Sequence, residues 1–490
     1  MSSLKFDRIV VVGGGTAGWM MATALATGLS GRASVELVEA EDIGIIGVGE
    51  ATFPTIREYN RLVNIDEREF LRATDGTFKL GIHFRDWLEP GSDYFHAFGP
   101  LGNLSGSQTL WGQHRRTGQT DPLQSLGAVM ALQGRFALPQ EGTKEYQYAF
   151  QFDAVKYATF LRELATQRGA RHTLGRIVDV SRRADGGVAA VVLDDGRRIE
   201  GDLFIDCSGF RSLLLGQTLG EPFVDFSHWL PVDAAWACPC ERSGDEILPY
   251  TQATALEGGW AWRIPLQSRT GHGHVFSSRF IDVDRAREQL LARLDGKQLA
   301  EPKLLRFKTG HRQRFWVHNV VAIGLSSGFL EPLESTSIYL AQEAIGRLMV
   351  ALTSGRPLQD GDRAQFNESL VRRFVRVRDF IILHYCLTRR RDSELWRHVA
   401  SMELPETLAF KMDAWRRFGV LWDYDEDPFF GQNWLTIFAG MDYWPKREDP
   451  VFAEIPLERA LKALQGRRQA IASAVERMPR HERALQDVLK

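Results

Sequence analysis

The pattern that most constrains the fold is a glycine-rich turn directly after the first apolar run of the chain. Residues 8–12 form a continuous run rich in β-branched side chains, which is typical of a strand buried on both faces. Gly13, Gly15 and Gly18 follow with the spacing G-x-G-x-x-G and open a helical segment. The first glycine permits a tight turn, the second lets a pyrophosphate approach the backbone, and the third lets helix and strand pack closely. The sequence therefore predicts a dinucleotide site, rather than a merely tight turn.

Other features of the chain indicate which nucleotide binds. Glu39 ends a second predicted strand at the spacing where an acceptor for the ribose hydroxyls belongs. A second glycine-rich stretch at residues 47–52, the strand end at residues 206–209 and Gly324 add points of close approach. Several dispersed glycine sites suit a long ligand, which favours FAD over NAD. An ordinary turn at residues 47–49 is the alternative.

The periodicity of the chain indicates an α/β fold. Residues 146–152 alternate aromatic side chains as a strand does, and Asp153 is placed to cap a helix that extends to about Gln167. Residues 176–206 have the turns and alternation of a meander, and residues 320–323 resemble a third buried strand. From about residue 337 the apolar period becomes helical and remains so through residues 457–478.

A chain of 490 residues is too long to fold around a single compact core, so we expect more than one domain. We expect an FAD-binding Rossmann-like domain of the flavin monooxygenase type at residues 1–355, with substrate-binding segments interleaved at about residues 80–150. A mostly helical substrate domain at residues 356–490 would pack on it.

The charge balance argues against nucleic acid and anionic membranes as partners. The chain has 60 basic and 62 acidic side chains and a net charge of −2. The basic run Arg389–Arg391 is interpreted as a solvated face or helix end. No apolar run approaches the length of a membrane span, and no signal peptide precedes residue 8, so we expect a cytoplasmic protein. The four cysteines lack a CxxC pair, although Cys238-Pro-Cys240 is an unusual spacing, and we expect reduced thiols and no metal site.

Five segments together resemble the flavin-dependent tryptophan halogenase family. They are Gly13-Gly14-Gly15-Thr16-Ala17-Gly18-Trp19, Gly47-Val48-Gly49-Glu50-Ala51-Thr52, Phe78-Lys79, Trp260-Ala261-Trp262-Arg263-Ile264-Pro265 and Phe329-Leu330-Glu331-Pro332-Leu333-Glu334-Ser335-Thr336. The glycine loop is shared with many flavoproteins, whereas W-x-W-x-I-P joined to Lys79 is far more specific. The resemblance implies FAD contacts from the following residues: Gly13, Gly15, Thr16, Ala17, Gly18, Glu39, Gly49, Glu50, Ala51, Gly324 and Ile338.

In this family, reduced flavin and O2 form a flavin hydroperoxide that a halide attacks, and the resulting hypohalous acid passes through a tunnel to the substrate. The resemblance implies that Lys79 binds or captures this oxidant, and that Glu334 orients it or accepts the proton lost from the ring. On the residues alone, Lys79 would be a surface lysine and Glu334 a helix-cap residue. FADH2 would come from a separate flavin reductase, since no second G-x-G-x-x-G for NAD(P)H is present.

The halide is expected at the start of a helix. Ser335, Thr336 and Ser337 begin a helical segment whose first N–H groups suit an anion. The resemblance places the halide against the backbone of Thr336 and Ser337. Tryptophan halogenases usually have glycine where this chain has Ser337. The added hydroxymethyl group could reshape the halide pocket, so the choice between chloride and bromide stays open, and bromide is favoured. Trp260 and Trp262 would shield the flavin from the substrate, and they also fit one face of a strand.

The substrate is expected to be an electron-rich aromatic, and an indole or a larger indole-bearing molecule is favoured over free tryptophan. His96 and Phe98 match the residues that sandwich the indole in the family, and Trp111 is a further candidate for this wall. Asn433 matches one of the polar residues that hold the amino acid's ammonium and carboxylate, but the other polar grips are missing. A site without them loses its discrimination for those groups. The sequence leaves both a monomer and a homodimer open.

Two other functions are consistent with the cofactor motif. A single-component flavin monooxygenase would use NADPH directly and hydroxylate an aromatic substrate, but Trp260, Trp262 and Lys79 argue against it. A flavoprotein that binds an indole as a sensor or carrier without turnover would have no need of Lys79 and Glu334.

Overall fold

The structure is a computed structural model that describes residues 6–40, 49–99, 125–140, 145–447, 454 and 456–490. The chain divides into two compact units, each made of three separate segments. Unit 1 comprises Met1–Gly76, Phe152–Ser227 and Phe307–Val375, and unit 2 comprises Thr77–Gln151, His228–Arg306 and Arg376–Lys490. The predicted division into residues 1–355 and 356–490 stays a prediction.

Unit 1 is built on a six-stranded sheet in the order β20-β21-β12-β1-β2-β8. Its strands are β1 (Arg8–Val12), β2 (Ser34–Glu39), β8 (Arg171–Leu174), β12 (Leu203–Asp206), β20 (Trp316–Val317) and β21 (Val320–Ala322). All neighbours are parallel except β20 and β21. The predicted βαβ opening is confirmed, because α1 (Thr16–Gly28) connects β1 to its parallel neighbour β2. Residues 9–12 are buried, as expected for a parallel strand covered on both faces.

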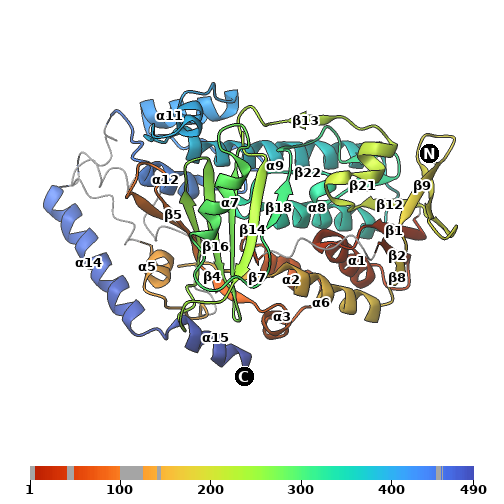
Figure 1. The fold of residues 1–490 in the computed structure, drawn as a ribbon, viewed down its shortest axis with the longest axis horizontal. Helices are drawn as coiled ribbons and strands as arrows, with labels where there is room; N and C mark the ends of the chain where they lie inside the picture. The colour runs from red at the N-terminus through yellow and green to blue at the C-terminus, as the bar shows by residue number, and fades with distance from the viewer. Residues whose placement is uncertain (1–5, 41–48, 100–124, 141–144, 448–453, 455) are drawn as a thin grey trace. The chain divides into compact units, whose positions relative to one another are not determined.

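Helices cover this sheet (Figure 1). The central helix α1 packs against α6 (Ala154–Gln167) and α8 (Thr336–Thr353). The expected cap of α6 is confirmed, since the Asp153 carboxylate accepts hydrogen bonds from the N–H groups of Val155 (2.9 Å) and Lys156 (3.1 Å). The predicted meander is confirmed for the antiparallel strands β9 (Ile177–Arg182), β10 (Val188–Leu193) and β11 (Arg198–Glu200). Its predicted last strand, β12, belongs instead to the six-stranded sheet.

The remaining elements of unit 1 are short. They are β3 (Gly49–Ala51), α2 (Ile56–Leu62), α3 (Glu67–Ala73), η2 (Gly209–Arg211), η3 (Leu213–Thr218), β13 (Phe223–Asp225), β19 (Gly310–Arg312), η4 (Gly324–Ser326), β22 (Gly328–Phe329) and η5 (Pro332–Glu334).

Unit 2 contains a seven-stranded sheet in the order β18-β14-β17-β16-β15-β5-β6. Its strands are β5 (Gly81–Arg85), β6 (Asp93–Ala97), β14 (Ala234–Cys240), β15 (Thr251–Ala255), β16 (Gly259–Pro265), β17 (Thr270–Phe276) and β18 (Lys303–Arg306). All neighbours are antiparallel except β15 and β5. A separate ladder joins β4 (Thr77–Lys79) to β7 (Ala149–Asp153), and the predicted aromatic strand therefore begins at Ala149 rather than at Tyr146.

The C-terminal segment is helical, as the periodicity predicts. The helices of unit 2 are α5 (Leu126–Leu132), α7 (Val283–Leu291), α10 (Glu394–Ala400), α11 (Glu406–Phe418), α12 (Gly431–Gly440), α14 (Leu457–Glu476) and α15 (His481–Leu489). The long helix α9 (Asp360–Cys386) contains the boundary between the units at residues 375 and 376. In the described part of the chain, no helix is both long and apolar enough to cross a membrane.

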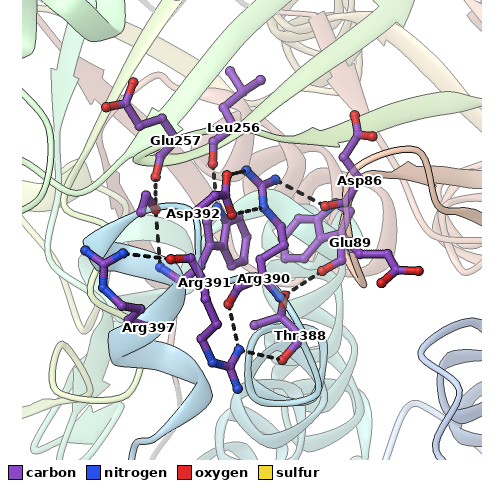
Figure 2. A network of polar contacts seen from close by, with 12 residues as sticks. Asp86, Glu89, Leu256, Glu257, Thr388, Arg390, Arg391, Asp392 and Arg397 are labelled. Atoms are coloured by element: carbon purple, nitrogen blue, oxygen red, sulfur yellow. Dashed lines mark hydrogen bonds and ion pairs between the residues drawn. The ribbon is translucent and has the colours of Figure 1, made fainter.

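The basic run follows the end of α9, and its arginines Arg389 and Arg391 are exposed, as predicted, whereas Arg390 between them is buried. Figure 2 shows Arg390 among polar partners of unit 2, where it donates to the backbone oxygen of Asp86 at 3.1 Å and pairs with Asp392 at 2.7 Å. Only 7% of Arg390 is exposed, and its guanidinium lies 4.7 Å from the centre of the Trp396 ring. Arg390 thus connects the end of α9 to the sheet, because the N–H groups of its guanidinium donate to several acceptors at once.

Candidate active site

The turn after β1 has the geometry that the glycine spacing predicts. Gly13 has a φ of +109°, and a Cβ there would lie 2.3 Å from the backbone oxygen of Cys207. A Cβ on Gly18 would lie 1.9 Å from the Gly13 oxygen, so only glycine lets α1 pack this closely on the turn. Gly15, in contrast, faces open space, and a Cβ at this position would meet no atom within 4 Å. The turn therefore leaves the N-terminus of α1 at Thr16 accessible to an anionic group.

The carboxyl ends of five parallel strands lie along the edge of the sheet at which this turn follows β1. From β1 the chain proceeds to β2 and β8 on one side, whereas β12 and β21 lie on the other side of β1. The strand order thus reverses direction at β1. In open α/β sheets, ligands bind where the strand order reverses, outside the carboxyl ends of the strands. Gly324, which follows β21, has a φ of +75°, and a Cβ there would lie 2.6 Å from Cβ of Ala17. Gly324 and Ala17 are thus brought together beside the glycine turn.

Glu39 also lies at this edge, at the end of β2. Its carboxylate pairs with His172 at 2.7 Å, and its Oε2 would be 1.5 Å from a Cβ on Gly14. Farther along, Gly49, Glu50 and Ala51 form β3. Burial raises the pKa of Glu50 to about 7, so this carboxyl titrates near neutral pH. Gly47 and Val48 lie outside the described residues.

The start of α8 forms a second unusual turn in unit 1. Glu334 ends η5 with 1% exposure, and Ser335 adopts a left-handed φ of +59° before the helix begins at Thr336. Such strained non-glycine residues concentrate at functional sites. The hydroxyl oxygens of Thr336 and Ser337 are buried without a hydrogen-bond partner among the described residues. Ile338, one turn into the apolar face, is 8% exposed.

Lys79 is buried at the end of β4 in unit 2, which excludes the surface-lysine interpretation. None of its surface is exposed, and its Nζ lies 5.0 Å from the centre of the Phe98 ring. Phe98 is held in register because its N–H donates to the Leu80 oxygen at 2.8 Å. A buried amine against an aromatic face is costly to desolvate and is consequently a strong candidate for a chemical role.

His96 is part of an aromatic wall in unit 2, defined here as His96, Phe380, Phe429 and Trp434. Phe380 and Phe429 stack with ring centres 3.7 Å apart, and His96 lies 5.7 Å from Phe380. Trp434 meets Phe380 edge-on at 5.2 Å. The amide of Asn433 hydrogen-bonds to His96 Nε2 at 3.1 Å, so these two sequence-predicted residues are brought together.

Sequence reasoning missed part of this arrangement. Phe380 lies within α9, where an apolar helical period gives no sign that this ring packs against His96. The buried ion pair of Lys411 and Asp427, 2.8 Å apart and 1% and 3% exposed, was also missed. Lys411 Nζ lies 3.8 Å from the centre of the Trp434 ring, one of the four rings of the wall. Trp111 lies outside the described residues.

Trp260 and Trp262 occupy β16, as their alternation predicts. They are 1% and 8% exposed, and their ring centres are 6.2 Å apart. A Cβ on Gly273 of the neighbouring β17 would lie 2.0 Å from the Trp262 ring, so glycine makes room for this side chain. The predicted strand is therefore confirmed, and the shielding role stays a prediction.

Known proteins are similar to this chain in sequence and in fold. The family described as tryptophan halogenase matches residues 8–456. This chain belongs to that family. Xcc4156, a flavin-dependent halogenase from Xanthomonas campestris, is 41% identical, with a TM-score of 0.94 over 99% of this chain and 98% of its own. BrvH, a flavin-dependent halogenase from Brevundimonas sp. BAL3, is 40% identical, with a TM-score of 0.93 over 99% of each chain. The tryptophan 6-halogenase SttH of Streptomyces toxytricini is 35% identical over 446 residues, 85% of each chain.

Membership of the family establishes the class of activity. The protein is a flavin-dependent halogenase, an oxidoreductase that acts on aromatic substrates, and its fold is α/β with an FAD-binding Rossmann-type domain. The expectation of a halogenase, drawn from the five segments, is confirmed, and the monooxygenase and sensor alternatives are not supported.

Proposed function

We propose that this halogenase acts on indole or a larger indole-bearing molecule, and that free tryptophan is not its preferred substrate. The aromatic wall supports the first half of the proposal, because flat apolar rings favour a flat aromatic substrate. The buried ion pair beside Trp434 supports the second half. Lys411 and Asp427 neutralise each other at 2.8 Å, so neither charge is available to the carboxylate or the ammonium of a free amino acid.

The catalytic roles proposed for the chain follow from the chemistry of two buried groups. Lys79 would bind or capture the hypohalous acid near the substrate, since its amine is buried and lies against the Phe98 ring. Glu334 would orient the oxidant or accept the proton that leaves the ring after electrophilic attack. The meeting of these two groups in one pocket, and the tunnel that leads to it, stay predictions.

The residues present fit an FAD molecule. The open space at Gly15 and the uncapped start of α1 suit a pyrophosphate, and Glu39 at the end of β2 suits a ribose hydroxyl. Thr16, Ala17, Gly18, Gly49, Glu50, Ala51, Gly324 and Ile338 would contribute further contacts. Bound in reduced form, FAD would activate O2, and O2 would be the oxidant that converts the halide to hypohalous acid. The FADH2 would be delivered by a separate flavin reductase.

The halide is proposed to lie at the start of α8. The buried hydroxyls of Thr336 and Ser337, without partners among the described residues, and the first N–H groups of the helix are donors that suit an anion. Ser337 adds a hydroxymethyl group where the family usually has glycine. This reshaped pocket is proposed to favour bromide over chloride.

The function is tested by competition between substrates. The assay contains purified protein, a flavin reductase, FAD, NADH and O2, with indole and tryptophan at equal concentrations and either bromide or chloride. The products are identified by mass spectrometry. Brominated indole is expected to exceed brominated tryptophan at least about tenfold, the discrimination that a lost polar contact can produce. Equal or preferred halogenation of tryptophan contradicts the substrate proposal, and a gain of one oxygen without halogen contradicts the reaction.

The role of Lys79 is tested with a matched lysine. Lys79→Ala is expected to abolish halogenated product while FAD binding and peroxide formation continue. Lys156→Ala, which removes a half-exposed lysine of α6, is the control and should retain activity. Normal halogenation by Lys79→Ala would refute the assignment.

A further inference from the structure

The strand β6 ends the seven-stranded sheet of unit 2 and carries part of the candidate site. It pairs with β5 on one side, and on its other side the described residues give it no strand partner. Its position there depends on side-chain contacts with helices. Tyr94 and His96 are two residues apart on β6, so their side chains point to the same side of the sheet. Tyr94 is therefore placed to influence His96, a member of the aromatic wall.

A hydrogen bond joins β6 to the helix α9. The hydroxyl oxygen of Tyr94 lies 2.6 Å from Nδ1 of His384, and the two residues are 5% and 0% exposed. The hydroxyl can donate to Nδ1 or accept a proton from it, so either neutral tautomer of the imidazole forms the bond. Phe84 on the neighbouring β5 stacks on both rings, with its centre 4.8 Å from that of Tyr94 and 4.6 Å from that of His384. A hydrogen bond buried in this way is costly to lose, because water does not replace the missing partner.

His384 lies one turn of α9 after Phe380, the ring that contacts the other three members of the aromatic wall. Residues four apart on a helix lie on the same face, and the rings of Phe380 and His384 meet edge to face with centres 5.6 Å apart. The centre of the His96 ring on β6 is 5.7 Å from that of Phe380. The bond between His384 and Tyr94 therefore fixes Phe380 on α9 relative to His96 on β6.

The ring of Tyr94 also supports the end of α12, the helix that carries Asn433 and Trp434 and packs on β6. A Cβ on Gly440 would lie 2.3 Å from Cγ of Tyr94, so glycine lets the end of the helix approach the ring this closely. Near the start of the helix, the amide of Asn433 hydrogen-bonds to His96 at 3.1 Å. The helix is consequently held against β6 at two points, and Tyr94 provides one of them.

We propose that the pair Tyr94–His384 positions the aromatic wall and thereby sets how tightly the enzyme binds the ring of its substrate. The two residues act through His96, Phe380 and α12, so they are positioning residues. Without the bond, β6, α9 and α12 keep their apolar packing but lose a directional contact, and the spacing between the rings of the wall varies more widely. A wall that must first be ordered binds a flat ring more weakly. The inference rests on the proposed function in one respect, that the substrate ring binds at this wall.

Four variants separate the hydrogen bond from a simple loss of packing. Tyr94→Phe removes the hydroxyl and keeps the ring, and His384→Leu removes Nδ1 and keeps an apolar side chain. His384→Asn is the rescue variant, because its amide places a polar atom near the position of Nδ1. Tyr59→Phe is the matched control, since it removes another buried tyrosine hydroxyl, which donates to the Met20 oxygen at 2.8 Å in unit 1.

Steady-state halogenation measures the effect, with indole or tryptophan as substrate, whichever the wild type halogenates faster. We expect Tyr94→Phe and His384→Leu to raise KM at least about tenfold while kcat changes less than about threefold, as when binding alone is weakened. His384→Asn should keep KM within about threefold of the wild-type value, and Tyr59→Phe should not change it. A wild-type KM in Tyr94→Phe, an equal rise in Tyr59→Phe, or a rise in His384→Asn as large as in His384→Leu overturns the proposal.

Amide hydrogen exchange of the full chain gives a second readout that needs no turnover. The amides of β6 and α12 should exchange at least about tenfold faster in Tyr94→Phe than in the wild type, and at the wild-type rate in Tyr59→Phe. If the wild type halogenates neither indole nor tryptophan, the proposed function fails, and this comparison alone decides the role of Tyr94. Faster exchange confined to Tyr94→Phe then supports the proposal, and unchanged exchange overturns it.

Discussion

His481 holds β4, the strand that ends in Lys79, in place, and we expect its removal to change both stability and activity. The side chain is fully buried at the start of α15. Its Nδ1 lies 2.7 Å from the Ile247 oxygen, and its Nε2 lies 3.3 Å from the N–H group of Phe78, the residue before Lys79. The first contact requires a proton on Nδ1 and the second requires a lone pair on Nε2. One neutral tautomer satisfies both, and a second proton breaks the contact with Phe78.

The cost of protonation follows from the pKa. Burial lowers the pKa of His481 from 6.5 to about 4. Because the unfolded chain binds the proton more readily than the folded one, the contribution to stability is complete above pH 6.5 and is lost as pH falls towards 4. Between about pH 7.5 and about pH 5, linkage predicts a loss of about 2 kcal/mol from this histidine.

Urea unfolding at these two pH values measures the effect. The wild type is expected to lose about 2 kcal/mol more on acidification than His481→Gln, which has no group to titrate there. His318→Gln, which removes an exposed histidine, should behave as the wild type. Halogenation by His481→Gln should also fall at about pH 7.5, because Phe78 and hence Lys79 lose a fixed position. An identical acid loss in wild type and His481→Gln would refute the reasoning.

Three further predictions concern other buried groups. Burial raises the pKa of Glu50 to about 7, so the folded chain binds this proton more tightly than the unfolded chain does. The free energy of unfolding therefore falls as pH rises from about 5 to about 8. In urea titrations, Glu50→Gln should remove about 2 kcal/mol of that fall. Lys411→Met should cost about 3–5 kcal/mol in the same assay by leaving Asp427 buried without its partner, and adding Asp427→Asn should recover part of the loss. Gly18→Ala should weaken FAD binding at least about tenfold in a fluorescence titration, since its Cβ would lie 1.9 Å from an oxygen, whereas Gly346→Ala, which meets no atom within 4 Å, should not.

Local signals predicted the parts of the molecule that local chemistry determines. The turn after β1 is specified by three glycines with separate steric reasons, and the start of α6 by the cap of Asp153, so both could be read from the chain. The pairing of Asn433 with His96 joins residues far apart in sequence, and only the resemblance singled out both. Phe380 is one of many apolar residues on its helix, and no periodicity predicts which of them packs against His96.

One residue of the basic run departs from a general rule, while Arg389 and Arg391 follow it. Consecutive arginines are usually solvated, yet Arg390 is buried because the backbone oxygen of Asp86, the Asp392 carboxylate and the Trp396 ring satisfy it together. These partners come from different elements of unit 2 and carry no common sequence signal. The same reason explains why Lys411 was missed, since its partner Asp427 and the ring of Trp434 lie on separate segments.

The order of strands in the first sheet has a consequence for the synthesis of the protein. The strand formed by residues 8–12 lies beside one formed by residues 203–206, which in turn lies beside residues 320–322. A nascent chain therefore displays its first apolar strand long before the neighbours on that side have left the ribosome. Exposed strand edges of this kind associate with other chains, and closing such distant pairings is slow. Soluble yield should consequently rise when translation is slowed by cooling or when general chaperones are supplied in excess.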